Sequence, residues 1–555
     1  MPRQHPGLAL HRPGRLEPGA GDRGGQSPSG LVLMDVAGLH HDEVDLAGGT
    51  DPLQVLRTQH RALAQVGSKV MDEYASFYVV NLCVPSVEAN RPHQLTKIET
   101  PMELPRVRLY NTFTRRKEEL RPLGAGKVSI YSCGPTVYRF AHIGNLRTFM
   151  VPDLLRRTLQ YLGYEVHQVM NITDVGHLTD DTADRGEDKM LVAARLENKS
   201  PEEIAAYYTN AFLEDLDRLN IRRADLYPHA TAYISRMIEL IQALIAKGYA
   251  YEIDGTVYYD ITSFPAYGRL SRNTTDTLLT GVRGEPDPRK RHPADFTLWK
   301  AAGEHRAQVW PSPWGLGYPG WHIECSAMSM SLLGDRFDIH TGGSDNVFPH
   351  HEAEIAQSEA VTGHQVVSIW MHGGLLMLSG TRMAKSAGNF FRVSDLVERG
   401  IDPLAFRYLT LQAKYRAPLN FTTENLMGAD RALRQLRERV AEWRVSGAAP
   451  DPALEDRFCR AIADDLDLPR VMALIAEVVR ADIAPPTKAS MLTRWDSVLG
   501  LDLDRSSRPT LPPGASELIA ERERARAAKD FAKSDELREQ LRAMGVEVAD
   551  EPIKR

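Results

Sequence analysis

The segment Tyr131–Arg147 (YSCGPTVYRFAHIGNLR) combines residue types that bind metals and phosphates. A β-like run breaks at Cys133-Gly-Pro, and a His-Ile-Gly-Asn step from His142 to Asn145 then opens an amphipathic helical pattern. When a strand of a parallel sheet turns through glycine into a helix, backbone N–H groups and the positive helix end meet at one point. That point suits a triphosphate, with the His142 ring beside it. Most joins of this kind are ordinary connections, so this segment alone does not decide between the two interpretations.

A second chemical motif is the run Thr381–Ser386 (TRMAKS), which lies in the Gly/Ser-bounded segment LSGTRMAKSAGNFF. A basic residue, a spacer and a Lys-Ser pair on a loop can close over a triphosphate and stabilise the charge that develops as pyrophosphate leaves. A Lys-Ser pair in a polar loop is usually only solvated. The motif becomes specific through its pairing with the His-Ile-Gly-Asn step at the opposite end of one sheet domain.

Four further side chains could form a metal site. His350 and Glu354 are four residues apart in a predicted helix, so they project from one face. With Cys133 and Cys325 they supply two thiolates, one imidazole and one carboxylate, a donor set that suits tetrahedral zinc. The cysteines lack close CxxC spacing, and the residues alone favour core cysteines and a solvated helix face. A zincin is excluded, because Ile355 occupies the position of the second histidine.

These side chains need a scaffold to bring them together, and the sequence predicts a parallel sheet. A strand, a helix and a second strand follow one another over 127–132, 146–163 and 165–173, which is the order of a βαβ unit. Signals of parallel strands resume at 336–340 and 366–371. The predicted fold class is therefore α/β.

The remaining segments indicate an insertion and a helical end. Helical periodicity covers 201–250, and short strands and turns cover 251–315, which indicates an insertion into the sheet domain. After Asp402 the chain is predicted to be almost wholly helical, with Pro/Gly/Ser-rich joins at 446–453 and 506–516.

Bulk properties limit the class of protein. A chain of 555 residues predicts two to four domains. The net charge of −6 argues against wholesale electrostatic binding of nucleic acid, although it leaves room for a local basic face. No run approaches the roughly 18 to 20 apolar residues that a membrane helix needs. Four scattered cysteines do not form a disulfide framework and fit a reducing cytosol.

The first 101 residues differ from the rest of the chain. They begin with a Gly-, Pro- and Arg-rich stretch that has neither helical nor alternating periodicity, so we expect residues 1–101 to be disordered. Our hypothesis is that Met102 is the true start and that the preceding residues are an extension of the gene assignment. The intact mass of the natively expressed protein tests this, and a mature N-terminus well upstream of Met102 would contradict it.

The two nucleotide motifs together resemble the HIGH and KMSKS signatures of class I aminoacyl-tRNA synthetases. From about residue 106 to 552 the chain is similar to the cysteinyl-tRNA synthetase family. The similarity is carried by Cys133–Tyr138, Asn171–Asp174, Asp295–Lys300, Gly320–Met328, Gly342–Asp345 and Phe348–Gln357. It implies a Rossmann-like class I catalytic domain with an insertion, followed by an all-α C-terminal bundle. The implied boundaries are 102–400 for the catalytic domain with its insertion at about 201–315, 401–446 for connecting stem-contact helices, and 447–555 for a helical anticodon-binding region.

The resemblance also implies an activity. It is a ligase reaction that activates L-cysteine with ATP to cysteinyl-adenylate and then charges tRNA(Cys). The implied enzyme is a cytoplasmic monomer without membrane association, and it takes one Zn²⁺ per chain and Mg²⁺ with ATP. Zinc lowers the pKa of a thiol and ligates a serine hydroxyl poorly, so metal ligation would select cysteine.

The site residues that the resemblance implies fall into four groups. They are Cys133, Cys325, His350 and Glu354 for zinc; His142, Asn145 and Lys385 for catalysis; His142, Gly144, Asn145, Gly343, Asp345, Lys385 and Ser386 for ATP; and Thr173 and Trp321 for cysteine.

Two departures and two alternatives accompany the resemblance. Arg382 and Ala384 stand where the family pattern has Lys and Ser, which changes donor geometry and removes one hydroxyl. We therefore expect altered loop energetics rather than inactivity.

A ligase of the mycothiol pathway shares the fold and joins cysteine to an amino sugar, but it should lack the long helical half after Asp402. A non-catalytic synthetase-like binding protein is the other alternative, and the intact motifs argue against it.

The helical half also carries clusters of cations. Interleaved acidic residues allow a solvated mixed face as an equal alternative, whereas the family analogy predicts contact with the tRNA backbone. The cations are Arg431, Arg434, Arg437, Arg439, Arg444, Arg522, Arg524, Arg526, Lys529 and Lys533.

Overall fold

The computed structural model describes residues 106–180, 185–273, 287–303, 306, 308–378, 381–382, 391–444, 448–505, 514–528 and 530–544. The chain divides into a unit over Met1–Thr100 and a unit over Pro101–Arg555, and every described element belongs to the second unit. The predictions for residues 1–101, for Lys385 and for Ser386 lie outside the described residues.

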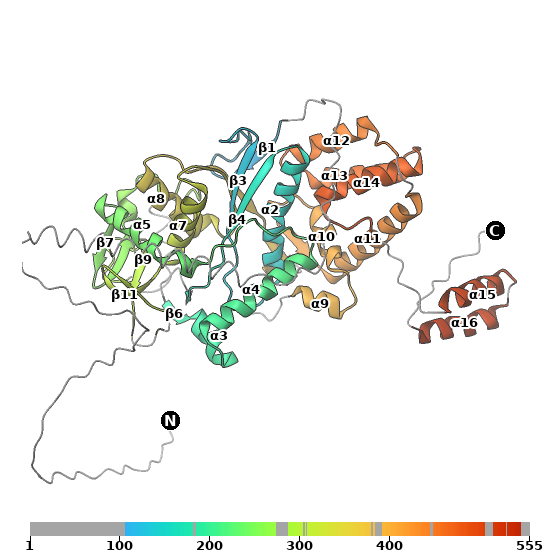
Figure 1. The fold of residues 1–555 in the computed structure, drawn as a ribbon, viewed down its shortest axis with the longest axis horizontal. Coiled ribbons are helices and arrows are strands. Elements are labelled where there is room, and N and C mark those ends of the chain that lie inside the picture. The colour runs from blue at the N-terminus through green and yellow to red at the C-terminus, as the bar shows by residue number, and fades with distance from the viewer. Residues whose placement is uncertain are drawn as a thin grey trace, which may run out of the picture. The chain divides into compact units, whose positions relative to one another are not determined.

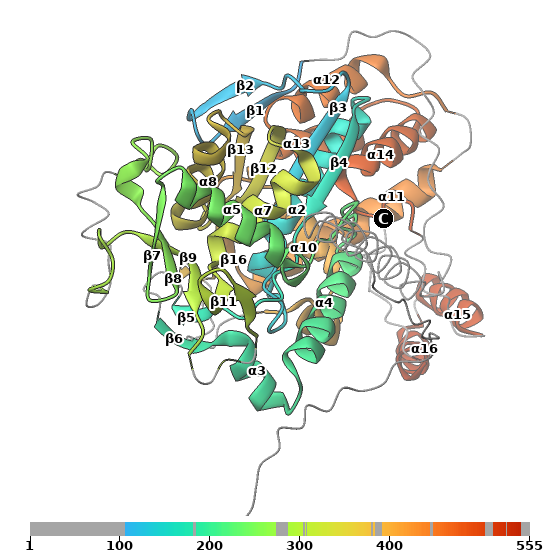
Figure 2. The same ribbon diagram turned by 60° about the vertical axis from the view of Figure 1, so that its left-hand side comes forward.

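The predicted parallel sheet is present, with four strands in the order β13-β12-β3-β4. Figure 1 labels β3 and β4 beside α2, and Figure 2 labels all four strands. Ile130 of β3 pairs with Ile339 of β12 on one side and with Gln168 of β4 on the other. All neighbours run parallel, so the carboxyl ends of the strands meet at one edge, where ligands bind in open α/β sheets. The α/β prediction is confirmed. The strands are β3 (Lys127–Ser132), β4 (Glu165–Met170), β12 (Phe337–Gly343) and β13 (Val367–Gly373).

Helices cover both faces of this sheet (Figure 2). Ile130 of β3 belongs to a core with α2 (Ile143–Tyr161), whereas the next residue of the strand, Tyr131, belongs to a second core. Successive residues of a strand point to opposite faces, so the two cores lie on opposite sides of the sheet. Helix α2 connects β3 to β4 and confirms the βαβ unit. The second core includes α5 (Ile234–Ala246), α7 (Trp321–Leu333) and α8 (Glu352–Thr362).

The chain between β4 and β12 forms a five-stranded antiparallel sheet in the order β10-β11-β9-β8-β7, together with helices. Its strands are β7 (Ala250–Ile253), β8 (Thr256–Tyr259), β9 (Phe296–Ala301), β10 (Trp310–Ser312) and β11 (Gly315–Pro319). A small hairpin precedes the helices and consists of β5 (Leu178–Asp180) and β6 (Arg185–Asp188). The helices are α3 (Lys189–Glu197), α4 (Pro201–Arg218) and η1 (Ala230–Tyr233), and a short helix η2 (Ile261–Ser263) follows β8. Two more small sheets pair β1 (Arg108–Asn111) with β2 (Arg116–Glu119), and β14 (Leu376–Leu378) with β15 (Thr381–Arg382) and β16 (Leu419–Phe421).

Among the described residues after Asp402, helices dominate and the short strand β16 is the one strand, as predicted. Phe406, Leu433 and Trp495 belong to the same core as α2, so α10 to α14 share one continuous core with that helix. In the described part of the chain, no helix is long and apolar enough to cross a membrane. The helices are α9 (Val393–Glu398), α10 (Pro403–Leu411), α11 (Thr423–Trp443), α12 (Pro452–Ala463), α13 (Leu468–Arg480), α14 (Pro485–Leu499), α15 (Ala515–Ala527) and α16 (Phe531–Ala543).

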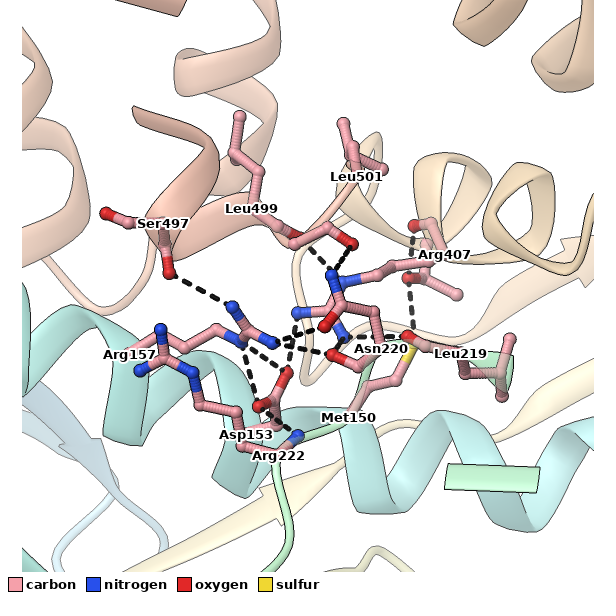
Figure 3. A network of polar contacts seen from close by, with 12 residues as sticks. Met150, Asp153, Arg157, Leu219, Asn220, Arg222, Arg407, Ser497, Leu499 and Leu501 are labelled. Atoms are coloured by element: carbon pink, nitrogen blue, oxygen red, sulfur yellow. Dashed lines mark hydrogen bonds and ion pairs between the residues drawn. The ribbon is translucent and has the colours of Figure 1, made fainter. Parts of the chain in front are cut away.

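A buried polar stripe joins α2 to these helices (Figure 3). Asp153 accepts a hydrogen bond from Arg157 Nε at 2.9 Å and from Arg407 Nη2 of α10 at 2.6 Å. Arg157 Nη1 donates to the Ser497 carbonyl of α14 at 3.1 Å, and Arg407 Nε donates to the Leu499 carbonyl at 2.5 Å. The stripe therefore attaches the middle of α2 to two helices that lie more than 200 residues later in the chain.

Candidate functional site

A cavity of about 320 Å³ lies beside the carboxyl end of β3 and the start of α2. Three groups of residues line it: the segment from Cys133 to His142, the first turns of α2, and residues from distant elements. The distant residues are Tyr208, Phe212, Trp321, Asp345, Asn346, Leu375 and Leu376. The cavity therefore places Cys133 and His142, which are nine residues apart, on one continuous wall.

The four predicted zinc residues converge beside this cavity, and one of them, Cys133, lines it. Cys133 follows β3, Cys325 lies in α7, His350 lies in the π-helical turn η3 (Val347–His351) and Glu354 lies in α8. One ligand atom from each of the four lies within 4.8 Å of the others, and all but the half-buried Cys133 are buried. Three separate segments must therefore fold together before the cluster exists.

The chemistry of the cluster fits a divalent metal. Burial raises the pKa of Cys133, and a hydrogen bond with Cys133 together with burial raises the pKa of Cys325 well above its ordinary value. Burial lowers the pKa of His350 far below its ordinary value, which keeps the ring in its neutral, metal-binding form. Glu354 Oε1 is buried and accepts no hydrogen bond from the described residues, although His350 Nε2 lies 3.2 Å away. A bound cation would satisfy this oxygen and favour the thiolates.

A second set of four potential ligands overlaps the first. It keeps Cys133 and Glu354 but replaces the other two with His340, at the middle of β12, and His351. His340 Nε2 lies 2.9 Å from Glu354 Oε2, and His351 Nε2 lies 3.1 Å from Cys133 Sγ. Neither histidine was predicted as a zinc ligand from the sequence. Two signals for these ligands were available in the sequence. One is a histidine within a buried parallel strand, and the other is a second histidine directly after His350.

Further histidines orient these ligands. His322 Nδ1 lies 3.1 Å from His350 Nδ1, so Nε2 of His350 is the atom that faces Glu354. His351 Nδ1 lies 2.8 Å from His372 Nε2, and the other nitrogen of His372 lies 2.8 Å from Thr112 Oγ1. Outer partners of this kind set the tautomer and ring orientation of a metal-binding imidazole.

The two residues predicted to contact cysteine lie in different settings. Trp321, the first residue of α7, lines the cavity and stacks on His350 with ring centroids 4.3 Å apart. Thr173 is buried behind the wall and does not line the cavity. Its hydroxyl donates to Glu324 at 2.8 Å and accepts from Asn171 Nδ2 at 3.1 Å. Trp321 therefore faces the cavity, whereas Thr173 is separated from it.

The His-Ile-Gly-Asn step forms the amino end of α2. His142 Nδ1 accepts a hydrogen bond from the Asn145 N–H at 3.0 Å, and Asn145 Oδ1 accepts from the His142 N–H at 3.3 Å. These reciprocal bonds form a capping box that holds both side chains at the helix end. A Cβ on Gly144 would lie 3.0 Å from the His142 ring, so glycine lets the ring lie flat against the first turn. The positive end of a helix and two oriented polar side chains suit a phosphate.

The Gly-Gly-Ser-Asp segment closes the other side of the cavity. Asp345 lines the cavity and is exposed, whereas Gly343 ends β12 behind it. Asn346 Oδ1 accepts the Gly343 N–H at 2.9 Å, and a Cβ on Gly343 would lie 2.3 Å from Asp345 Oδ1. Glycine at 343 thus permits the tight turn that presents Asp345.

The segment that contains Lys385 and Ser386 starts and ends beside α2. Before it, Met377 and Leu378 of β14 pair with Arg382 and Thr381 of β15. After it, the Phe391 carbonyl accepts a hydrogen bond from the Ile143 N–H at 2.8 Å. Phe391 and, on the other flank, Leu376 of β14, whose Cβ lies 3.7 Å from the position of a Cβ on Gly144, are therefore near the end of α2 that carries His142.

The predicted cation cluster on α11 is not uniform. Arg431, Arg434 and Arg439 are exposed, but Arg437 is buried and donates to the Leu501 carbonyl at 2.6 Å. Arg437 is therefore a packing residue, which corrects its inclusion among the surface cations. Its place in the helix turns it towards the core, a distinction that charge alone does not make.

Two segments of the chain match known protein families. Residues 119–431 match the family described as tRNA synthetases class I (C) catalytic domain, and residues 508–554 match the cysteinyl-tRNA ligase anticodon binding domain.

Curated relatives match over most of their length. A cysteine–tRNA ligase of Treponema denticola is 42% identical over 486 residues, which is 81% of this chain and 98% of the relative. The cysteine–tRNA ligase 1 of Burkholderia lata is 46% identical, with 80% and 95% covered. The cysteine–tRNA ligase of Thermus thermophilus is 44% identical, with 80% and 97% covered.

Proposed function

Because the chain belongs to the cysteine–tRNA ligase family of class I aminoacyl-tRNA synthetases, we propose that Cys133, Cys325, His350 and Glu354 hold one Zn²⁺. The activity is that of the family: L-cysteine is activated with ATP, and the cysteinyl group is transferred to tRNA(Cys). The observation that carries the metal assignment is the convergence of the four ligand atoms within 4.8 Å.

When bound, zinc supplies a Lewis acid that lowers the pKa of the substrate thiol and takes its sulfur as a ligand. The protein supplies the rest of the selection. Trp321, stacked on His350, closes one side of the cavity over the ligand set. Shape alone discriminates by only about 1–3 kcal/mol, whereas a specific bonding requirement reaches roughly 10⁴-fold. This difference explains how serine is rejected.

The amino end of α2 is the proposed ATP site. His142 and Asn145, with Gly144 between them, contact the phosphates, and Asp345, presented by the turn at Gly343, lies on the opposite wall, under the adenosine. Mg²⁺ accompanies the nucleotide. The substrate carboxylate attacks the α-phosphorus in line while the helix end and Lys385 stabilise the charge on the departing pyrophosphate. Cys133 and His142 share one cavity wall, which brings the amino acid and the nucleotide together.

Replacement of Lys385 by alanine is expected to slow cysteinyl-adenylate formation by about 10²-fold or more, the scale of one lost contact to developing charge. Pyrophosphate exchange measures this step without tRNA. Lys127→Ala is the matched control, because Lys127 lies at the amino end of β3 and pairs with Glu165 on the surface. Exchange at the wild-type rate in the Lys385 variant would contradict its proposed role.

Aminoacylation of tRNA(Cys), with and without a zinc chelator, tests the function as a whole. Charging that falls on chelation and returns with added zinc supports both the reaction and the metal.

The ligase that joins cysteine to an amino sugar is disfavoured, since residues 508–554 match an anticodon-binding domain. Transfer of cysteine to a glucosamine-type acceptor in place of tRNA would reverse that choice.

We further propose that the enzyme acts as a monomer in the cytoplasm. The cavity and the cluster are built from residues of a single chain. The thiols of Cys133 and Cys325 must stay reduced to hold a metal, which a reducing compartment ensures. Light scattering of the purified protein measures its mass, and a dimer with altered activity on dilution would contradict the monomer.

A further inference from the structure

Arg147 lies on α2, two residues after Asn145, and is buried without lining the cavity. Its guanidinium donates to three backbone carbonyls: Nη1 to Gly374 at 2.8 Å and to Leu375 at 2.7 Å, and Nη2 to Ala417 at 2.6 Å. Within the described part of the chain no carboxylate forms an ion pair with it. Burial lowers the pKa of Arg147 to about 10, so the side chain is still charged at neutral pH.

The three carbonyls belong to two segments that cross at short range. The Gly374 N–H donates to the Tyr415 carbonyl at 2.8 Å, and the Leu419 N–H donates to the Leu375 carbonyl at 3.0 Å. A Cβ on Gly374 would lie only 2.4 Å from the Ala417 carbonyl oxygen, so glycine allows this crossing. The crossing directs three carbonyl dipoles at one point, and the planar guanidinium offers donors in a matching fork.

This crossing positions one wall of the cavity. Leu375 and Leu376 line the cavity, as do Gly144 and Asn145. Leu376 starts β14 and pairs with Leu419, and its Cβ lies 3.7 Å from the position that a Cβ on Gly144 would take. The bonds of Arg147 to the crossing therefore fix the separation between this wall and the first turn of α2.

We propose that Arg147 is a positioning residue for ATP, which holds Leu375 and Leu376 against the amino end of α2 and so sets the width of the nucleotide end of the cavity. This proposal rests on the placement of ATP at His142 and Asn145. The metal-binding end depends on other elements, α7 and α8, and Arg147 donates to neither. A defect at Arg147 is therefore specific for ATP over cysteine.

The experiment compares Arg147→Met and Arg147→Lys with Arg437→Met in pyrophosphate exchange. Arg437 is the matched control, since it is equally buried at 3% exposed and also donates to backbone carbonyls, those of Leu501 and Asp502, far from the cavity. We expect the methionine variant of Arg147 to raise the KM for ATP about tenfold or more, because small misplacements of a binding wall are costly. The KM for cysteine stays within about twofold. Lysine restores part of the loss, and Arg437→Met lowers the melting temperature without either KM change.

A KM for ATP within about twofold of wild type in folded Arg147→Met, or an equal rise in both KM values, overturns the proposal. If this variant does not fold, Gly374→Ala perturbs the same crossing from the other strand, and its unchanged KM for ATP is equally decisive. His142→Ala separates this result from the proposed function. A wild-type KM for ATP in His142→Ala would contradict the placement of ATP at His142. A raised KM for ATP in His142→Ala together with a wild-type KM in Arg147→Met would contradict only the role of Arg147.

Discussion

Replacement of Cys325 by serine is expected to remove the bound zinc and to lower cysteine-dependent pyrophosphate exchange by about 10³-fold or more, because a bound metal supplies several kcal/mol of charge stabilisation. Cys325 is almost fully buried at 2% exposed, and its sulfur faces Cys133 rather than solvent. A hydroxyl in its place is a harder and much weaker acid, so the site loses one of its two thiolates. Metal analysis of the purified variant and the exchange rate at saturating ATP measure both effects.

Two controls make this result specific. Cys459 is buried in α12, outside both ligand sets, so Cys459→Ser is expected to retain zinc and activity. His340→Ala separates the two overlapping sets, since it removes a ligand from the second set only. If Cys325→Ser retains its zinc and His340→Ala loses it, the zinc ligands are those of the second set, which contains His351.

Replacement of Asp153 by asparagine is expected to lower the free energy of unfolding by roughly 3–5 kcal/mol, the cost of breaking a buried ion pair from one side. Asp153 is 1% exposed, and asparagine would leave Arg157 and Arg407 charged and buried without their carboxylate. Since α2 also carries the proposed ATP contacts, the loss of activity on heating should follow the lower melting temperature. Denaturant and thermal unfolding of both proteins measure the difference.

The matched control is Glu477→Gln, which removes an exposed ion pair with Arg457 between α12 and α13 and should leave the melting temperature unchanged.

The pH dependence of the unfolding free energy gives a second check on Asp153. Burial alone would raise the pKa of Asp153, but Arg157, Arg407 and the Arg222 amide together lower it below its ordinary value. The carboxylate therefore contributes fully above about pH 4, and its contribution is lost as the pH falls through the folded-state pKa. A stability difference that grows with acidification would contradict this account.

Much of the fold was predictable from local sequence. The strand at Lys127–Ser132, the helix that follows and the strand at Glu165–Met170 appear where the apolar periodicity placed them. The helical end after Asp402 is also confirmed. The cap formed by His142 and Asn145 depends on residues three apart, so the sequence alone determines its geometry once a helix starts there.

The chemistry of individual side chains depended on contacts between distant segments. Cys133 and Cys325 lie 192 residues apart, and no local pattern shows that their sulfur atoms meet beside Glu354. The second ligand pair, His340 and His351, becomes visible only when β12 and α8 pack together. Sequence spacing predicts which residues share an element, but it does not predict which elements share a core.

The same reason explains why Arg437 was predicted among the surface cations. Arg147, Asp153 and Arg437 are each buried against segments far away in the chain, which charge alone does not show. A buried charge is tolerated only where carbonyls or an opposite charge converge on it. The sequence by itself therefore determined the elements and the residue types of the site. Tertiary packing decided which charges are internal and which ligands meet, since both depend on the approach of backbones that are remote in sequence.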